Sequence, residues 1–116
     1  MHAYLDNAAT TPVAPEVVKA MTEVHSTVFG NPSSTHLPGR KAKALVETSR
    51  RTIAKLLGVA PRTICFTSGG TEADNHAIQA AVGCLGVKRI ITSEAEHSAV
   101  IKSTQMARDQ HQVELN

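Results

Sequence analysis

The chain has 116 residues and a mass of 12.3 kDa, which is enough for one small domain and no more. Its 41% hydrophobic and 19% charged residues are typical of a soluble globular protein and exclude the disordered and fibrous classes. A net charge of +2, a scarcity of aromatic residues and the lack of a long apolar run argue against a dedicated nucleic-acid binder and against a membrane protein.

The first residues and the cysteines indicate a compartment. Residues 1–11 contain neither the basic segment nor the apolar segment of an export signal. Cys65 and Cys84 are too few for a disulfide framework, and a reducing environment suits them. We therefore expect a cytoplasmic protein.

Two amphipathic helices are predicted in the first half of the chain. Residues 1–14 form an extended lead-in, after which Pro15 suits the first turn of a helix that ends near Gly30. A loop over 30–34 follows, and then a longer helix that Gly58 terminates. Apolar residues recur at helical spacing in both segments: Val17, Met21, Val24 and Val28 in the first, and Ala42, Leu45, Val46, Ile53, Leu56 and Leu57 in the second.

Three short apolar or β-branched segments in the second half predict strands, at 63–67, 88–92 and 112–115. Helical spacing fills the intervals, at 71–83 and 97–110. An alternation of strands and helices predicts parallel pairing and therefore an α/β fold. The sheet stops at its third strand, so we expect the chain to be an N-terminal piece of a longer protein, incomplete at its C-terminus.

A glycine-containing turn, Thr67-Ser68-Gly69-Gly70-Thr71, lies between a predicted strand and a predicted helix. Backbone N–H groups at a helix N-terminus attract an anion, and glycines let a phosphate approach the backbone closely. Two interpretations stay open on these residues alone. The turn either binds a phosphate, with Thr71 adding its hydroxyl, or is a tight connection in which Ser68 or Thr71 caps the helix.

His97 follows the next predicted strand. Ligands of open α/β sheets bind beyond the carboxyl ends of the strands, so His97 and Gly70 are expected at one crevice. The imidazole there either stacks on a cofactor and moves protons, or only caps its helix. Glu94 and His97 also match half of a di-iron ligand set, but the second half is missing and no metal is expected.

Four separated motifs occur in order along the chain. They are LDNAATTP at 5–12, GNPSS at 30–34 followed by His36 and Gly39, FTSGGTEADN at 66–75, and Thr92-Ser93 followed by Glu96-His97. Together they resemble the start of cysteine desulfurases of the NifS/IscS type, which are pyridoxal-phosphate enzymes of the class-V aminotransferase family. Each motif alone is weakly specific, but the resemblance rests on all four and extends over the whole chain.

The resemblance implies a fold-type-I enzyme, usually a homodimer, that converts L-cysteine to L-alanine with pyridoxal 5'-phosphate as cofactor. The sulfur passes to an enzyme cysteine as a persulfide and then to sulfur-acceptor or iron–sulfur scaffold proteins. Gly70 and Thr71 match the turn that binds the cofactor phosphate, and His97 matches the histidine that stacks on the pyridine ring and assists proton transfer. Residues 1–14 belong with the small domain, and 15–116 open the large cofactor-binding domain.

Other groups that the family requires match no residue of this sequence. The Schiff-base lysine and the persulfide cysteine are expected beyond residue 116, so the isolated chain is expected to be inactive. Neither Lys88 nor Lys102 stands at the lysine position, and neither Cys65 nor Cys84 at the cysteine position. Alternatives are another class-V enzyme, such as selenocysteine lyase, or a non-enzymatic α/β module that binds a phosphorylated ligand or a protein partner.

Overall fold

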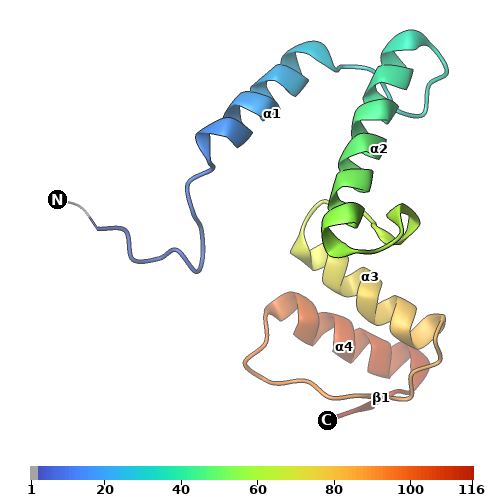
Figure 1. The fold of residues 1–116 in the computed structure, drawn as a ribbon. Helices are drawn as coiled ribbons and strands as arrows, with labels where there is room; N and C mark the ends of the chain where they lie inside the picture. Colours follow the sequence, from blue (N-terminus) through green and yellow to red (C-terminus); the bar gives the residue numbers. More distant parts are fainter. Residues whose placement is uncertain (1–2) are drawn as a thin grey trace. The chain divides into compact units, whose positions relative to one another are not determined.

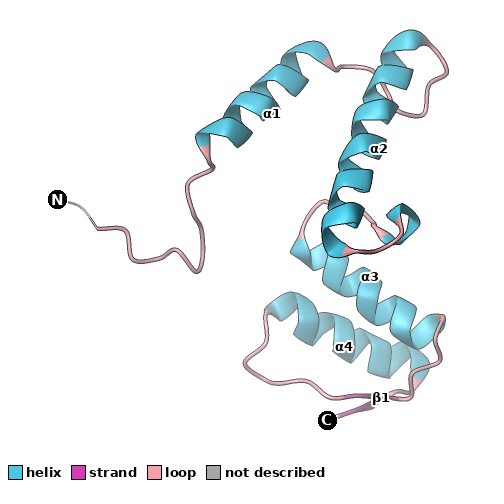
Figure 2. Cartoon of the chain, in the orientation of Figure 1, coloured by secondary structure: helices cyan, strands magenta, loops and turns pink. Residues whose placement is uncertain are grey.

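The computed structural model describes residues 3–116, which form two compact units that meet in sequence between Ile64 and Cys65. Four α-helices carry most of the described chain, and strands contribute only two short segments (Figures 1 and 2). None of the helices in residues 3–116 is both long enough and apolar enough to cross a membrane.

The first unit is helical. It contains α1 (Pro15–Thr27), α2 (Leu37–Leu57) and the short 3-10 helix η1 (Pro61–Thr63). The predicted boundaries are confirmed, because a proline occupies the first turn of α1 and Gly58 ends α2 in the left-handed region with φ 67°.

Two glycines allow the loop between α1 and α2 to pack closely against the start of α2. A Cβ on Gly30 would lie 2.3 Å from the carbonyl carbon and oxygen of Pro38, and a Cβ on Gly39 would lie 2.6 Å from the carbonyl oxygens of Asn31 and Ser34. Only glycine permits these approaches of backbone to backbone. The GNPSS segment is therefore a packed loop whose shape depends on both glycines.

The second unit is built on a βαβ arrangement. It contains α3 (Gly70–Gly83), β1 (Arg89–Ile90), α4 (Ser98–His111) and β2 (Glu114–Leu115). The two strands pair in parallel, with α4 as the crossover between them. This confirms the α/β fold and its parallel pairing, although both strands are shorter than the sequence predicts.

The core of the second unit lies where α3 packs against α4 and against the residue that precedes β2. Val82, Ala107 and Val113 are its buried residues, with Ile78 and Ile90 packed against them. The buried residues of α4 are Ala99, Ser103, Thr104 and Ala107, of which the first, second and fourth are small residues at four-residue spacing. Small side chains at these positions let the two helices approach closely.

The strand predicted at 63–67 is wrong. Thr63 ends η1, and Ile64 has an extended backbone, with φ −87° and ψ 118°, but the segment pairs with no strand among the described residues. Phe66 is accordingly 45% exposed. The backbone angles of Ile64 are those of a strand, and its carbonyl accepts a hydrogen bond from the side chain of Arg50.

Large apolar side chains remain exposed in both units. On α1, Val17, Val18 and Met21 are each about half exposed, and Ile91 beyond β1 is 80% exposed. Contiguous surfaces of this kind are normally covered by further protein. We expect more chain or a second copy to cover them.

The glycines give a test of the packing. We expect Gly39→Ala to lower the free energy of unfolding by about 1–3 kcal/mol, because its methyl group overlaps two carbonyl oxygens. Gly83→Ala is the control, since a Cβ there meets no described atom within 4 Å, and the substitution should raise stability by about 0.4–1 kcal/mol. Urea unfolding measures both, and equal effects of the two changes would contradict the packed loop.

Candidate functional site

The N-terminus of α3 forms the predicted glycine turn. Gly69 is the N-cap in an extended conformation, φ 170° and ψ −178°, and its carbonyl accepts the first hydrogen bond of the helix, from Ala73 N–H at 3.1 Å. The N–H groups of Gly70, Thr71 and Glu72 have no intrahelical acceptor, as in any first turn. Neither Ser68 nor Thr71 caps the helix with its side chain, so the capping interpretation of the turn is wrong.

Neither glycine of the turn is required by contacts within the described chain. A Cβ on Gly69 or on Gly70 would meet no described atom within 4 Å, and neither residue has a positive φ in the left-handed region. The space over the turn is thus open, in contrast to the space over Gly30 and Gly39. An open space above free N–H groups at a helix N-terminus is what an anion needs.

The Glu72 side chain is hydrogen-bonded to Ser68, the residue that precedes the two glycines of the turn. Its Oε2 accepts two hydrogen bonds from Ser68, one from the backbone N–H and one from the hydroxyl, each 2.7 Å long. The backbone N–H of Ser68, followed by its hydroxyl, holds the pKa of the Glu72 carboxyl below its usual value, and the nearby His76 acts in the same direction. Glu72 is therefore a carboxylate at neutral pH, and Ser68 is tied to the first helical turn.

His97 lies at the N-cap of α4. Its Nδ1 accepts a hydrogen bond from the N–H of Ala99 at 3.2 Å, and the side chain is exposed. A neutral imidazole that accepts at Nδ1 carries its proton on Nε2. The capping interpretation of His97 is confirmed, and capping leaves Nε2 available, so it does not exclude a role toward a ligand.

The packing of the second unit brings the two turns to one end. α3 and α4 lie side by side, and both helices begin at the same end of the unit (Figure 1). Gly70 and Thr71 open the first of them, and His97 caps the second. The expectation that these residues border one crevice stays a prediction, because no strand precedes α3 among the described residues.

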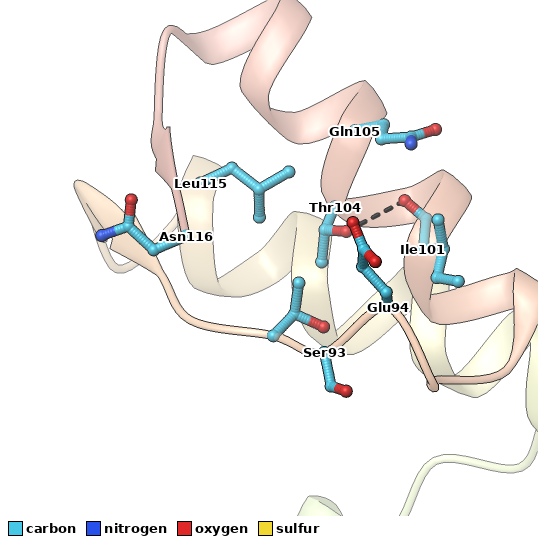
Figure 3. A pocket seen from close by; sticks show the side chains of 8 residues that line it. Ser93, Glu94, Ile101, Thr104, Gln105, Leu115 and Asn116 are labelled. Carbon is cyan, nitrogen blue, oxygen red and sulfur yellow. Dashed lines mark hydrogen bonds between the residues drawn. The ribbon is translucent and has the colours of Figure 1, made fainter.

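A pocket of about 220 Å³ lies between the segment that joins β1 to α4, helix α4 and the end of β2 (Figure 3). Thr92, Ser93 and Glu94 form one wall, Thr104 on α4 another, and Leu115 on β2 a third. The hydroxyl of Thr104 donates to the carbonyls of Val100 and Ile101 on its own helix. The pocket includes none of the predicted site residues Gly70, Thr71 and His97.

The two cysteines and His36 are the remaining candidate residues. Cys65 lies in the segment 63–67 that was predicted as a strand, and it is exposed because that strand does not form. Cys84 follows α3 and is exposed too. His36 caps α2 by accepting from Gly39 N–H at 3.3 Å, a role the sequence analysis missed because histidine is not a typical N-cap. Residues 3–116 contain no cluster of potential metal ligands.

Comparison with known proteins identifies the family. Residues 3–116 match the family described as Aminotransferase class-V. The chain belongs to this family.

Relatives in the class-V family include two kinds of enzyme. The chain is 45% identical over 106 residues to a cysteine desulfurase of a Frankia strain, which covers 90% of this chain and 25% of the relative. It is 48% identical over 101 residues to the cysteine desulfurase IscS of Dictyoglomus turgidum, covering 85% and 26%. It is 49% identical over 81 residues to rat selenocysteine lyase, covering 70% and 19%. The chain thus spans about a quarter or less of these relatives.

A solved structure described as a NifS-like protein has the same fold over this region. The TM-score between the two structures is 0.87 at 33% sequence identity. The match covers 100% of this chain and 32% of the NifS-like chain. This confirms that the class-V chain is a partial α/β unit of the kind found in NifS-like enzymes. Enzymes of this family use pyridoxal phosphate, and the open space over Gly69 and Gly70 fits the phosphate of that cofactor.

The bonds between Ser68 and Glu72 can be measured by titration. We expect the Glu72 carboxyl to titrate below an unperturbed glutamate, because Ser68 stabilises its charged form. The bonds are complete above the unfolded-state pKa and are lost as pH falls through the lowered folded pKa. In Ser68→Ala, which keeps the backbone hydrogen bond, the pKa of Glu72 should rise only part of the way to its usual value, as followed by carboxyl carbon NMR. No rise at all, or the same rise in the control Ser93→Ala, would contradict the contact.

Proposed function

We propose that this chain is the N-terminal part of a pyridoxal-phosphate-dependent cysteine desulfurase, which converts L-cysteine to L-alanine and passes the sulfur to an enzyme cysteine. The cysteine desulfurases among its relatives, at 45% and 48% identity over most of the chain, support this activity. The observation that carries the proposal is the N-terminus of α3, where two glycines without a packing role leave free N–H groups exposed.

In this proposal Gly70 and Thr71 hold the cofactor phosphate. The N–H groups of the first turn donate to the phosphate oxygens, and the helix dipole favours the negative charge. The Thr71 hydroxyl adds one charge-assisted hydrogen bond, because its side chain makes no other such bond among the described residues. The absence of a Cβ at Gly70 lets the phosphate reach the backbone.

His97 acts at the ring of the cofactor and at the substrate. When bound, pyridoxal phosphate supplies an electron sink that stabilises negative charge on the carbon next to the substrate amino group. The hydrogen bond from Ala99 fixes the His97 ring through Nδ1. Its Nε2 then remains to hold or move a proton, while the flat face of the ring can stack on the cofactor.

The partners of the whole protein are part of the proposal. They are L-cysteine as substrate, a second copy in a homodimer, and a sulfur-acceptor or iron–sulfur scaffold protein, all in the cytoplasm. The exposed apolar side chains of α1 are consistent with further protein covering this helix.

A second candidate is selenocysteine lyase, because the rat enzyme is 49% identical over 70% of the chain. The two activities differ in the element removed, so the ratio of kcat/KM for L-selenocysteine to that for L-cysteine separates them. Efficient turnover of both substrates supports a desulfurase. A full-length protein that turned over only L-selenocysteine would be a lyase.

The two proposed roles predict different defects in the full-length protein. Thr71→Ala removes one hydrogen bond to a charged phosphate, worth about 1.5–3 kcal/mol, and should weaken cofactor affinity by about one to two orders of magnitude. Gly70→Val should weaken it further, because a β-branched side chain fills the space over the turn. Absorbance titration with pyridoxal phosphate measures both.

His97→Ala should instead leave most of the cofactor bound. Turnover of L-cysteine should fall by about two orders of magnitude or more, because the proton-transfer group is lost. Alanine and sulfide release at saturating cofactor measure this rate. Wild-type turnover in His97→Ala, together with normal cofactor affinity in Thr71→Ala, would refute both assignments.

A further inference from the structure

We propose that Glu72 is a positioning residue that holds the phosphate-binding turn in its binding shape by fixing Ser68. This rests on the proposed function, since it concerns the site where the phosphate would bind. No other side chain of the described residues ties Ser68 to α3, and the two hydrogen bonds from Ser68 end on one oxygen, Oε2.

The turn needs such a fixed point because of its composition. Gly69 and Gly70 have no Cβ, and no described atom lies within 4 Å of the place where one would be. Glycines lose the most conformational freedom on ordering, so a turn with two of them is intrinsically mobile. The bonds between Ser68 and Glu72 bracket the two glycines, and a third bond, from the Thr67 hydroxyl to the Gly69 carbonyl at 3.1 Å, orients the N-cap.

The same contact decides which donors are left for a phosphate. Glu72 occupies both donors of Ser68, so the remaining donors are the first-turn N–H groups and the Thr71 hydroxyl. A carboxylate close to a phosphate repels it, and here the two Ser68 hydrogen bonds stabilise that carboxylate. The role of Glu72 is therefore to accept hydrogen bonds, and its negative charge is not what the phosphate requires.

Two substitutions of Glu72 should therefore differ in their effect on the affinity for pyridoxal phosphate. Glu72→Gln keeps an oxygen that can accept both Ser68 bonds and removes the charge, so affinity for pyridoxal phosphate should stay within about threefold of the wild type. Glu72→Ala removes the acceptor, and affinity should fall about tenfold, the equivalent of one hydrogen bond of about 1.4 kcal/mol. Affinity for pyridoxal, which lacks the phosphate, should be the same in all three proteins.

The experiment is an absorbance titration of the full-length protein and its variants with pyridoxal phosphate and with pyridoxal. Asp109→Ala is the control, because it removes the same charge from an exposed position of α4. Equal affinity for pyridoxal phosphate in Glu72→Ala and wild type would overturn the inference. A loss of equal size in Glu72→Gln, or an equal loss of pyridoxal affinity, would overturn it as well.

Failure of the proposed function gives a different result. A wild-type protein that bound no pyridoxal phosphate would refute that function, and amide hydrogen exchange would then test Glu72 by itself. Faster exchange at Gly69, Gly70 and Thr71 in Glu72→Ala than in wild type supports the positioning role. Unchanged exchange rates at these three residues would overturn it.

Discussion

Close packing of α3 against α4 is the interaction on which the candidate site depends. Ala99, Ser103 and Ala107 present a face of small side chains, and Val82 of α3 is buried in the core that results. Because the helices lie side by side and begin at the same end, their first turns border one region. Large side chains on this face of α4 would separate the turns that carry Gly70 and His97.

The candidate site contains two helix N-termini, and they differ in whether a side chain caps them. At α4, His97 satisfies the N–H of Ala99 with its own Nδ1, so this end is capped by the chain itself. At α3, Gly69 offers no capping side chain, and the first-turn N–H groups stay open. A helix end left uncapped beside an open space is a place for an external anion, and a self-capped end is a place for a fixed side chain.

The sequence predicts the helices better than the strands, for a physical reason. Helix limits depend on local signals, such as Pro15 in the first turn of α1 and Gly58 after α2. A strand needs a neighbouring strand, and residues 64–67 join no strand ladder among residues 3–116. Motifs locate the glycine turn and His97. They miss the Glu72 contact, because Ser68 and Glu72 are four residues apart and the usual capping box is spaced by three.

The proposed function requires that the N-terminus of α3 binds the phosphate of pyridoxal phosphate. The most direct measurement is NMR of the full-length protein labelled with 15N-glycine and 15N-threonine, with pyridoxal phosphate and with pyridoxal. We expect large shifts of the Gly70 and Thr71 amide resonances with pyridoxal phosphate and small ones with pyridoxal, because only the former brings a phosphate to these N–H groups. Unmoved Gly70 and Thr71 resonances in a protein that demonstrably binds pyridoxal phosphate would contradict it.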